Sequence, residues 1–183
     1  MELEFYEIGS SEELMLKAAE VLCDTFNSLG NSHWPDLESS LKEVRECCAA
    51  PNICIGICER GEMLGWVGLR PMYAKTWELH PLVVSSRHQK GGLGRMLVAE
   101  LEERARALGI IGIVLGTDDE QDQTSLSKID IDSENIFREI AGIKNLSRHP
   151  FEFYKKCGYI IVGIIPNANG YRKPDIWMWK GLC

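Results

Sequence analysis

The chain has 183 residues and a formal net charge of −7, and 45% of its residues are hydrophobic and 26% charged. This composition is typical of a globular protein, and the length predicts one domain over residues 1–183. The negative charge argues against nucleic acid or an anionic membrane as the partner, and it leaves room for a cationic ligand.

The strand and helix pattern of the first sixty residues is regular. Residues 3–8 are predicted to form a strand, and residues 10–26 a helix with Ser10 and Glu13 at the spacing of a capping box. A loop that ends at Pro35 leads to a second helix over residues 37–48.

Two strands follow, over residues 52–59 and 62–70, and the Arg60-Gly61 connection predicts a hairpin. The period of two in the first of these strands places Cys54 and Cys58 on one face.

The second half of the chain alternates between strands and helices. A helix over residues 94–109 lies directly between strands at 77–84 and 110–117, which predicts a parallel crossover. A long polar segment, residues 118–135, comes next. The remaining elements are helices near 136–143 and 149–158 and strands at 159–166 and 175–181, so the fold class is a mixed α/β domain around one central sheet.

No membrane segment, secretory signal or metal site is predicted. The longest apolar run, residues 159–165, is much shorter than the ~20 residues that span a bilayer. Residues 1–10 are acidic, whereas a secretory signal is basic and then apolar, so we expect a cytoplasmic protein. The seven cysteines are odd in number and are expected to be free thiols, and no Cys-x2-Cys or His-x3-His pair predicts a metal.

The turn "SSRHQKGGLGRMLV", residues 85–98, is rich in glycine and positive charge between a strand and a helix. Backbone N–H groups at a helix start lack intrahelical partners and lie at the positive end of the helix dipole. Three glycines let a phosphate approach that backbone, and three cations surround it: Gly91, Gly92, Gly94, Arg87, Lys90 and Arg95. The turn therefore predicts a pyrophosphate-bearing ligand, with a plain strand-to-helix connection as the alternative.

Two familiar phosphate-binding motifs are excluded. The turn lacks the Gly-Lys-Ser/Thr ending of a Walker A loop, and Leu97 stands where a dinucleotide fingerprint has its third glycine. The six residues Gln89, Lys90, Gly91, Gly92, Leu93 and Gly94 instead resemble the acyl-CoA signature, Gln/Arg-x-x-Gly-x-Gly/Ala, of the GNAT N-acetyltransferase superfamily.

Four further blocks narrow this resemblance. "WELHPLVV", "LGTDDE", "NLSRHPFEFYKKCGY" and "PNANGYRKPDIWM" are similar, in the same order, to the aminoglycoside 6′-N-acetyltransferases of that superfamily. The resemblance implies a GNAT-like fold with a central mixed, mostly antiparallel sheet flanked by helices. It also implies that acetyl-CoA donates an acetyl group to the 6′-amino group of aminoglycoside antibiotics, which confers resistance, and that the protein is a homodimer.

The resemblance assigns catalytic roles along one strand and one helix. Acetyl transfer needs a neutral amine, and Glu78 resembles the carboxylate that holds and deprotonates the acceptor. His80 would share the face of Glu78 on a regular strand and would orient the acceptor or relay its proton. Tyr154 resembles the tyrosine that protonates the CoA sulfur. The alternatives are a solvent-facing glutamate, a structural histidine and a core aromatic.

The resemblance assigns the donor to main-chain groups as well. It places the oxyanion at the Leu82 N–H, and Pro81, which has no N–H, is expected to interrupt the strand ladder there. The main chain of Leu82, Val83 and Val84 would pair with the pantetheine amides, and the turn from Gln89 to Arg95 would hold the pyrophosphate.

Acceptor binding is expected to use negative charge. The segment 118–135 has seven acidic residues and one lysine: Asp118, Asp119, Glu120, Asp122, Asp130, Asp132, Glu134 and Lys128. A solvated acidic loop is the plain interpretation, and recognition of a polycation is the functional one. Asp118 is the first candidate because it lies at the end of a strand. Trp34 and Tyr73 resemble family contacts to the sugar rings, with packing as the alternative.

Two other functions remain open from the sequence. A GNAT enzyme for another amine, such as a polyamine or a protein N-terminus, would share the Gln89 turn without needing the four blocks. A CoA-binding module without turnover would not need Glu78 or Tyr154. The apolar segment 175–181 is a candidate for the subunit contact of the homodimer that the resemblance implies.

Overall fold

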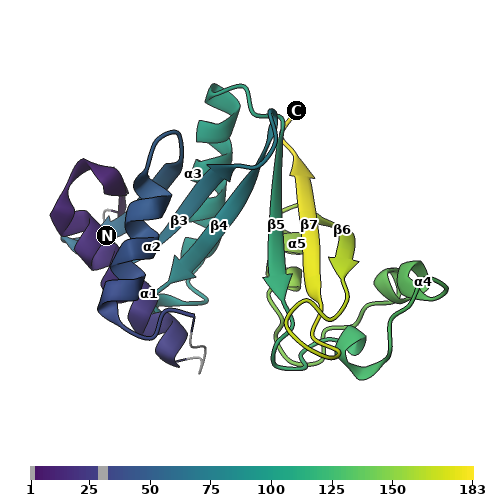
Figure 1. Cartoon of the computed structure of the whole chain (residues 1–183). Coiled ribbons are helices and arrows are strands. Elements are labelled where there is room, and N and C mark those ends of the chain that lie inside the picture. The colour runs from purple at the N-terminus through teal and green to yellow at the C-terminus, as the bar shows by residue number, and fades with distance from the viewer. Residues whose placement is uncertain (1–2, 29–32) are drawn as a thin grey trace. The chain divides into compact units, whose positions relative to one another are not determined.

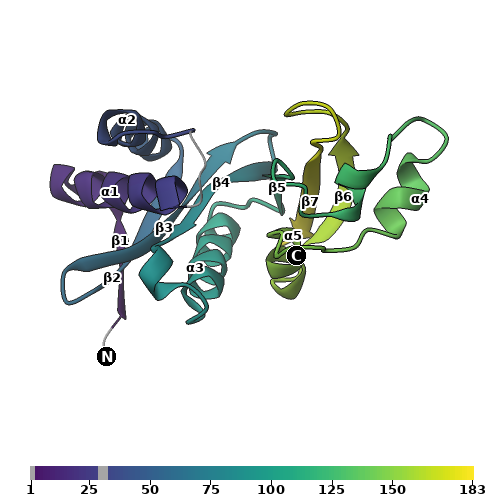
Figure 2. The ribbon, with the colours of Figure 1, turned by 90° about the horizontal axis from the view of Figure 1, so that it is seen from below.

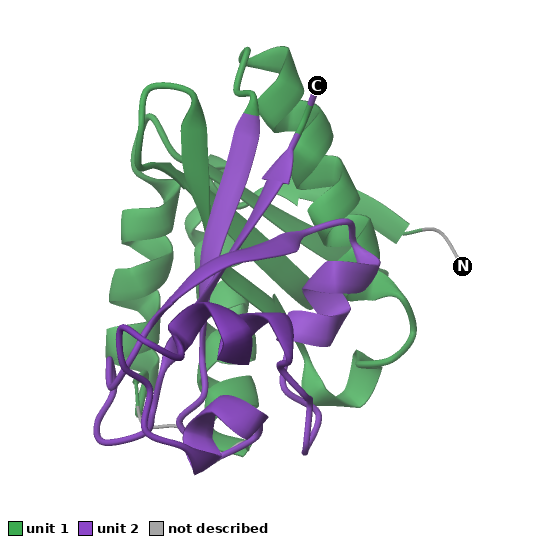
Figure 3. Ribbon diagram, turned by 90° about the vertical axis from the view of Figure 1, so that its right-hand side faces the viewer, with its two compact units in different colours: residues 1–111, 182 green, residues 112–181, 183 purple. Residues whose placement is uncertain are grey.

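The computed structural model describes residues 3–28 and 33–183. The chain divides into two compact units, which are described separately below. Unit 1 comprises residues 1–111 and 182, and unit 2 comprises residues 112–181 and 183 (Figure 3). The prediction of one domain over the whole chain stays a prediction.

Unit 1 is built on four antiparallel strands, which are labelled in Figure 2. They lie in the order β1 (Leu3–Glu7), β2 (Ile53–Glu59), β3 (Glu62–Pro71) and β4 (Thr76–Val84). Glu59 lies opposite Glu62, so the predicted hairpin at Arg60-Gly61 is confirmed. Arg60 and Gly61 both have positive φ, the conformation that a tight two-residue turn between β2 and β3 requires.

Helices cover both faces of this sheet. Figure 2 shows α1 (Glu12–Ser28) and α2 (Leu37–Cys48) on one face and α3 (Leu93–Ala107) on the other. The two-sided burial explains why β3 is almost continuously apolar rather than alternating. Its Trp66 indole N–H donates to the Ala18 carbonyl of α1 at 3.0 Å, whereas the neighbouring Gly65 faces α3.

The start of α1 differs from the prediction. Ser10 belongs to a short 3-10 turn, η1 (Ile8–Ser10), which the burial of Ile8 anchors after the first strand. The helix begins at Glu12, and the hydroxyl of Ser11 accepts the Leu14 N–H at 3.2 Å. The N-cap is therefore Ser11, and the predicted capping box of Ser10 with Glu13 is wrong.

The second helix begins and ends as predicted. Asp36 accepts the Ser39 N–H at 2.8 Å and Ser39 bonds back to it, which makes a capping box that the sequence analysis did not propose. The core between these two helices and the sheet includes Cys54 and Cys58, so their predicted shared face is confirmed.

Unit 2 holds a three-stranded antiparallel sheet in which β7 (Asp175–Gly181) lies between β5 (Gly112–Asp118) and β6 (Ile160–Ile165) (Figure 1). Its short helices are α4 (Ile136–Ala141), α5 (Phe151–Lys156) and the 3-10 turn η3 (Ser125–Lys128). Because β4 and β5 belong to different units, the parallel crossover between them stays a prediction.

Within the residues that the structure describes, no helix has the length and apolar character needed to span a membrane.

Candidate active site

Strand β4 carries a bulge in the middle of its ladder with β3. Two residues of β4, His80 and Pro81, lie opposite one residue of β3, Gly68. A Cβ at Gly68 would stand 2.3 Å from the His80 carbonyl oxygen, so only glycine permits this approach. The bulge lies where the missing N–H of Pro81 predicts an interrupted ladder.

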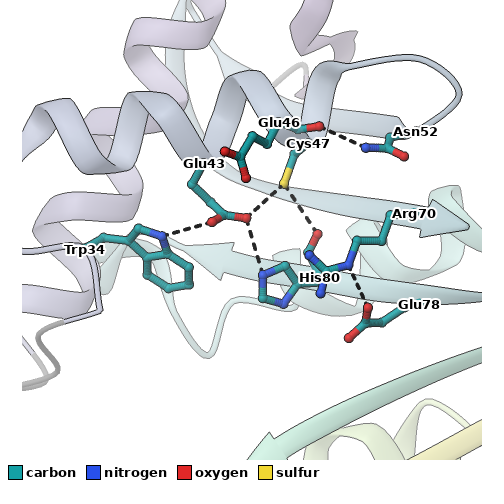
Figure 4. A network of polar contacts seen from close by, with 8 residues as sticks. All are labelled: Trp34, Glu43, Glu46, Cys47, Asn52, Arg70, Glu78 and His80. Atoms are coloured by element: carbon teal, nitrogen blue, oxygen red, sulfur yellow. Dashed lines mark hydrogen bonds and ion pairs between the residues drawn. The ribbon is translucent and has the colours of Figure 1, made fainter. Parts of the chain in front are cut away.

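Glu78 precedes the bulge and is ion-paired. Arg70 lies directly opposite it on β3, and the Arg70 Nε donates to Glu78 Oε2 at 2.6 Å (Figure 4). Arg70 alternates in phase with Trp66, whose indole bonds to α1, so Glu78 faces the layer of α1 and α2. The guanidinium of Arg70 therefore already neutralises Glu78, the carboxylate that is predicted to bind the acceptor.

His80 faces the same layer and meets a carboxylate from α2. Its Nε2 lies 3.4 Å from Glu43 Oε1, and 31% of its side chain is exposed. The predicted shared face of Glu78 and His80 is thus confirmed. Figure 4 shows both side chains projecting from β4 beneath the helix that carries Glu43.

Glu43 is the centre of the polar network in Figure 4, and the sequence analysis missed it. Its Oε2 accepts the indole N–H of Trp34 at 3.2 Å, and its Oε1 accepts the thiol of Cys47 at 3.5 Å. The hydrogen bond from His80 lowers the pKa of Glu43 and outweighs burial, which acts in the opposite direction. Burial keeps the Cys47 thiol protonated by raising its pKa, so it acts as a donor.

One signal in the sequence points to Glu43. The buried positions of α2 are Ser40, Val44 and Cys47, which recur at helical spacing. Glu43 lies along that apolar stripe, three residues after the first and four before the last of them, where a charged residue is unusual.

The two predicted acceptor-contacting aromatics have different environments. Trp34 packs edge-on against Phe26, with ring centroids 4.6 Å apart, and its ring lies 6.3 Å from that of His80. Tyr73 lies in the turn between β3 and β4 and is 64% exposed. The structure therefore brings Trp34 to the Glu78 and His80 group and leaves Tyr73 on the surface of the turn.

The end of β4 presents main-chain groups away from β3. The Ser85 N–H donates to the Leu64 carbonyl at 2.9 Å, which fixes the hydrogen-bonding phase of this antiparallel pair. Because bonding alternates along such a pair, Val83 bonds to β3, and the N–H groups of Leu82 and Val84 point away from it. The Val84 carbonyl accepts the side-chain amide of Gln89 at 3.0 Å.

The glycine turn forms the start of α3. After a 3-10 turn, η2 (Ser86–His88), Gly92 caps the helix with a φ of +91°, a conformation that favours glycine. The N–H groups of Arg95 and Met96 donate to the Gly92 carbonyl, so those of Leu93 and Gly94 have no partner within the helix. A Cβ at Gly92 would meet nothing within 4 Å, which means that the turn faces open space.

Tyr154 belongs to unit 2 and lies on α5. It is 9% exposed, and its ring packs edge-on against Phe153 and Tyr159 at 5.1 and 5.8 Å between centroids. Burial raises the pKa of Tyr154, so the phenol stays protonated at neutral pH.

Asp118, also in unit 2, is the exposed last residue of β5. The side-chain amide of Asn169 donates to its carboxylate, and its backbone carbonyl lies 3.1 Å from Nε2 of the buried His149. Since the Phe151 N–H donates to His149 Nδ1, the proton of that ring is on Nε2 and is donated to Asp118. Burial lowers the pKa of His149, which makes it a neutral structural histidine.

Known proteins resemble the chain over its full length. The model of the acetyltransferase (GNAT) family matches residues 17–126. A crystal structure of an aminoglycoside 6′-N-acetyltransferase complexed with coenzyme A has 38% identity and a TM-score of 0.90, with 100% of this chain and 98% of that one covered. The chain belongs to the GNAT family, among the aminoglycoside 6′-N-acetyltransferases.

Two further structures agree with this assignment. The aminoglycoside 6′-N-acetyltransferase from Enterococcus faecium has 38% identity and a TM-score of 0.87, and an aminoglycoside 6′-acetyltransferase type Ii has 34% identity and a TM-score of 0.75. Both comparisons cover 100% of this chain and 98% of the other. No curated protein sequence matches the chain.

Membership of the family confirms the predicted fold class, a GNAT-like α/β fold with a mostly antiparallel sheet flanked by helices. It leaves the roles of individual residues as predictions. Within the described ranges 3–28 and 33–183, no group of three or more His, Cys, Asp or Glu side chains is arranged to hold a metal ion.

Proposed function

We propose that the chain transfers the acetyl group of acetyl-CoA to the 6′-amino group of aminoglycoside antibiotics and thereby confers resistance to them. The observation that carries the proposal is the full-length similarity, at 38% identity, to enzymes of that name, one of them in complex with coenzyme A. The side chains and main-chain groups of β4 and α3 supply chemistry that suits this reaction.

The donor would lie along the end of β4 and the start of α3. The N–H groups of Leu93 and Gly94, at the positive end of α3, would bind the pyrophosphate together with Lys90 and Arg95. The open space at Gly92 lets the phosphate reach that backbone. Main-chain groups of Leu82 and Val84 that point away from β3 would pair with the pantetheine amides, with Val83 between them.

The acceptor would enter as an ammonium ion beside Glu78. Arg70 holds that carboxylate at 2.6 Å, so the acceptor ammonium would replace a guanidinium and exchange one ion pair for another. The main role of Glu78 would therefore be to bind the cationic acceptor, and its further role would be to accept a proton from it. Trp34 would contact a sugar ring next to it, and Tyr73 and Asp118 would bind other groups of the polycation.

The transfer step needs three events. The neutral amine nitrogen attacks the thioester carbonyl carbon, and the Leu82 N–H stabilises the oxyanion that forms. The carbon–sulfur bond then breaks, and the phenol of Tyr154 gives a proton to the departing thiolate. The acceptor ammonium loses one proton before the attack and a second from the tetrahedral intermediate, both through Glu78 or His80. One of them returns through solvent to the Tyr154 phenolate and the other is released, so charges and protons balance.

We also propose a cytoplasmic homodimer. All seven cysteines are free thiols, which suits a reducing compartment. The exposed apolar side chains of unit 2 include Ile160, Val162 and Ile165 on the edge strand β6. The inner strand β7 buries Ile176 and Met178, so β6 is a better candidate for the subunit contact than the segment 175–181 that the sequence suggested.

A turnover screen tests the function. Release of the CoA thiol would be measured with a 6′-amino aminoglycoside, its 6′-hydroxy counterpart and spermidine as acceptors. We expect turnover with the first alone. Turnover with spermidine only would favour the related function of a GNAT enzyme for another amine, and binding of acetyl-CoA with no turnover of any amine would favour a CoA-binding module.

A further inference from the structure

Glu43 contacts two residues of the proposed acceptor site through separate oxygen atoms. Oε1 lies 3.4 Å from His80 Nε2, and Oε2 accepts the Trp34 indole N–H at 3.2 Å (Figure 4). Its side chain is 17% exposed, whereas the side chain of Glu46, one turn along α2, is 64% exposed. A half-buried carboxylate with both oxygens occupied is in a position to fix the orientation of its partners.

We infer that Glu43 is a positioning residue for acetyl transfer, which holds the His80 ring with its proton on Nε2 and holds the Trp34 indole beside it. This inference rests on the proposed function of the site. It adds a residue of α2, a helix to which the proposed function gives no role.

The contact with Glu43 determines which nitrogen of His80 is free to accept a proton. A carboxylate accepts and does not donate, so Nε2 of the neutral ring must carry the hydrogen. Nδ1 then keeps its lone pair and is the atom that can take a proton from the acceptor ammonium. When that proton arrives, the ring becomes an imidazolium with Glu43 as its counter-ion, and no other proton needs to move.

The other charged and titratable groups near His80 do not replace Glu43 in this role. Arg70 and Glu78 are paired with each other, and Cys47 donates to Glu43 Oε1 at 3.5 Å and to the His80 carbonyl at 3.7 Å. Glu43 is ionised at neutral pH, because the hydrogen bond from His80 lowers its pKa.

The Glu43 carboxylate that contacts His80 also bonds to Trp34, the residue proposed to contact a sugar ring of the acceptor. Trp34 also packs edge-on against Phe26, so the indole contacts both α1 and Glu43. Removal of the Glu43 carboxylate would free both the imidazole and the indole, whereas removal of the Trp34 N–H alone would free only the indole. The two contributions can therefore be separated by substitution.

The first measurement uses the unmodified protein. The chain has four histidines, so the ring nitrogens can be assigned by NMR from long-range nitrogen–proton correlations, with His80→Gln to identify the signal. At a pH where the ring is neutral, we expect the proton of His80 on Nε2. A proton on Nδ1 would overturn the inference, whatever the enzyme acetylates.

The second measurement is kinetic and uses Glu43→Gln, with Glu46→Gln as the matched control on the exposed side of α2. We expect Glu43→Gln to lower kcat/KM for the acceptor at least roughly tenfold, less than the ~100- to 10,000-fold typical of acid–base groups, because Glu43 acts through His80. KM for acetyl-CoA and the melting temperature should stay within error, and Glu46→Gln should change nothing. Glu43→Asp, which keeps the charge, should recover part of the loss.

A double-mutant cycle decides whether Glu43 acts through His80. In a His80→Ala background, Glu43→Gln should cost much less than in the wild type, and the remainder should match Trp34→Phe. An equal loss in both backgrounds would contradict the positioning role. If the wild type turns over no aminoglycoside, the proposed function fails, but the NMR measurement still tests the contact of Glu43 with His80.

Discussion

The acidic segment of unit 2 and the single Glu43 carboxylate of unit 1 show how little the number of acids says about their use. Residues 118–135 hold seven acids, yet several of them serve the fold of the segment itself. Glu43 is one acid on an ordinary amphipathic helix, and it contacts two residues of the proposed acceptor site. A carboxylate is thus better judged by its partners than by its neighbours in the sequence.

The segment 118–135 illustrates the structural use of charge. Asp119 is fully buried and accepts the backbone N–H groups of Gln123 and Thr124. Asp132 accepts the N–H groups of Glu134 and Asn135, as in the turns that aspartate favours. These carboxylates accept hydrogen bonds from backbone N–H groups that would otherwise have no partner, because the loop has no regular secondary structure.

The largest effect is expected on stability, when a structural carboxylate of the segment 118–135 is removed. Asp119→Ala would leave three donors inside the protein without an acceptor, namely two backbone N–H groups and the Thr124 hydroxyl at 2.7 Å. We expect a loss of about 3 kcal/mol, which lowers the melting temperature by roughly 6–12 °C for a chain of this size.

Asp122→Asn is the control for this experiment, because Asp122 has a positive φ that asparagine tolerates better than alanine. Asp122 lies in the same segment, its side chain is 53% exposed, and its distance of 3.7 Å from Lys128 makes a weak surface pair. Its removal should hardly change the melting temperature. Equal melting temperatures for the two variants would mean that the segment is a uniformly solvated acidic loop.

The next effect concerns a buried group of unit 2 that has a proposed chemical role. Tyr154→Phe removes one oxygen and keeps the ring, so its packing against Phe153 and Tyr159 should survive. We expect the single-turnover rate to fall at least roughly tenfold, about 1.4 kcal/mol of barrier, with unchanged acetyl-CoA affinity. Single-turnover conditions prevent slow product release from masking the loss.

A normal single-turnover rate for Tyr154→Phe would leave Tyr154 as a core aromatic. The phenol has a raised pKa because it is buried, so it is a weak acid for a thiolate. A fall in the single-turnover rate of much less than tenfold would indicate that the phenol only stabilises the sulfur by a hydrogen bond. Solvent would then supply the proton to the thiolate.

Most of the fold could be predicted because it depends on local patterns. Hydrophobic periodicity identifies the helices and strands, and glycine marks the start of α3 at the turn that contains Gly92. The wrong N-cap at Ser10 has a tertiary cause, since burial of Ile8 winds the chain into a 3-10 turn before the helix begins. Local spacing does not contain that information.

The site was harder to predict because its contacts join distant segments. Glu43 is bonded to Trp34 and His80, and the second of these is 37 positions further along the chain. The pairing of Arg70 with Glu78 depends on the register of β3 and β4, which the bulge opposite Gly68 shifts. Residue types therefore predicted the chemistry of β4, and only the structure supplied its partners.

A smaller effect is expected at the one exposed acid that we assign to the acceptor. Asp118→Asn should raise the acceptor KM a few-fold with little change in kcat, because an exposed carboxylate contributes a modest and screened attraction. The acceptor KM of the wild type should also rise with ionic strength more than the KM for acetyl-CoA. An acceptor KM that is indifferent to both changes would remove the proposed role of Asp118.

The smallest expected effect is a pH-dependent contribution to stability from the ion pair between Asp130 and Arg172. Arg172 holds both carboxylate oxygens, with Nε at 3.0 Å and Nη2 at 2.7 Å, and Tyr171 donates to the same group at 2.6 Å. The hydrogen bond from Arg172, and then that from Tyr171, lower the pKa of Asp130 to about 2. A lowered folded-state pKa means that the stabilisation is complete above the unfolded value of about 3.9 and is lost as the pH falls through 2.

The side chains of Asp130 and Arg172 are exposed, at 63% and 37%, so solvent screening keeps the effect small. We expect Arg172→Gln to melt slightly below the wild type at pH 6 in low salt, with the difference shrinking steadily below pH 4 and in 1 M salt. Lys128→Gln, at the looser pair with Asp122, is the control and should show no such trend. A difference for Arg172→Gln that is constant from pH 3 to pH 7 would show that Arg172 stabilises the segment by packing rather than by charge.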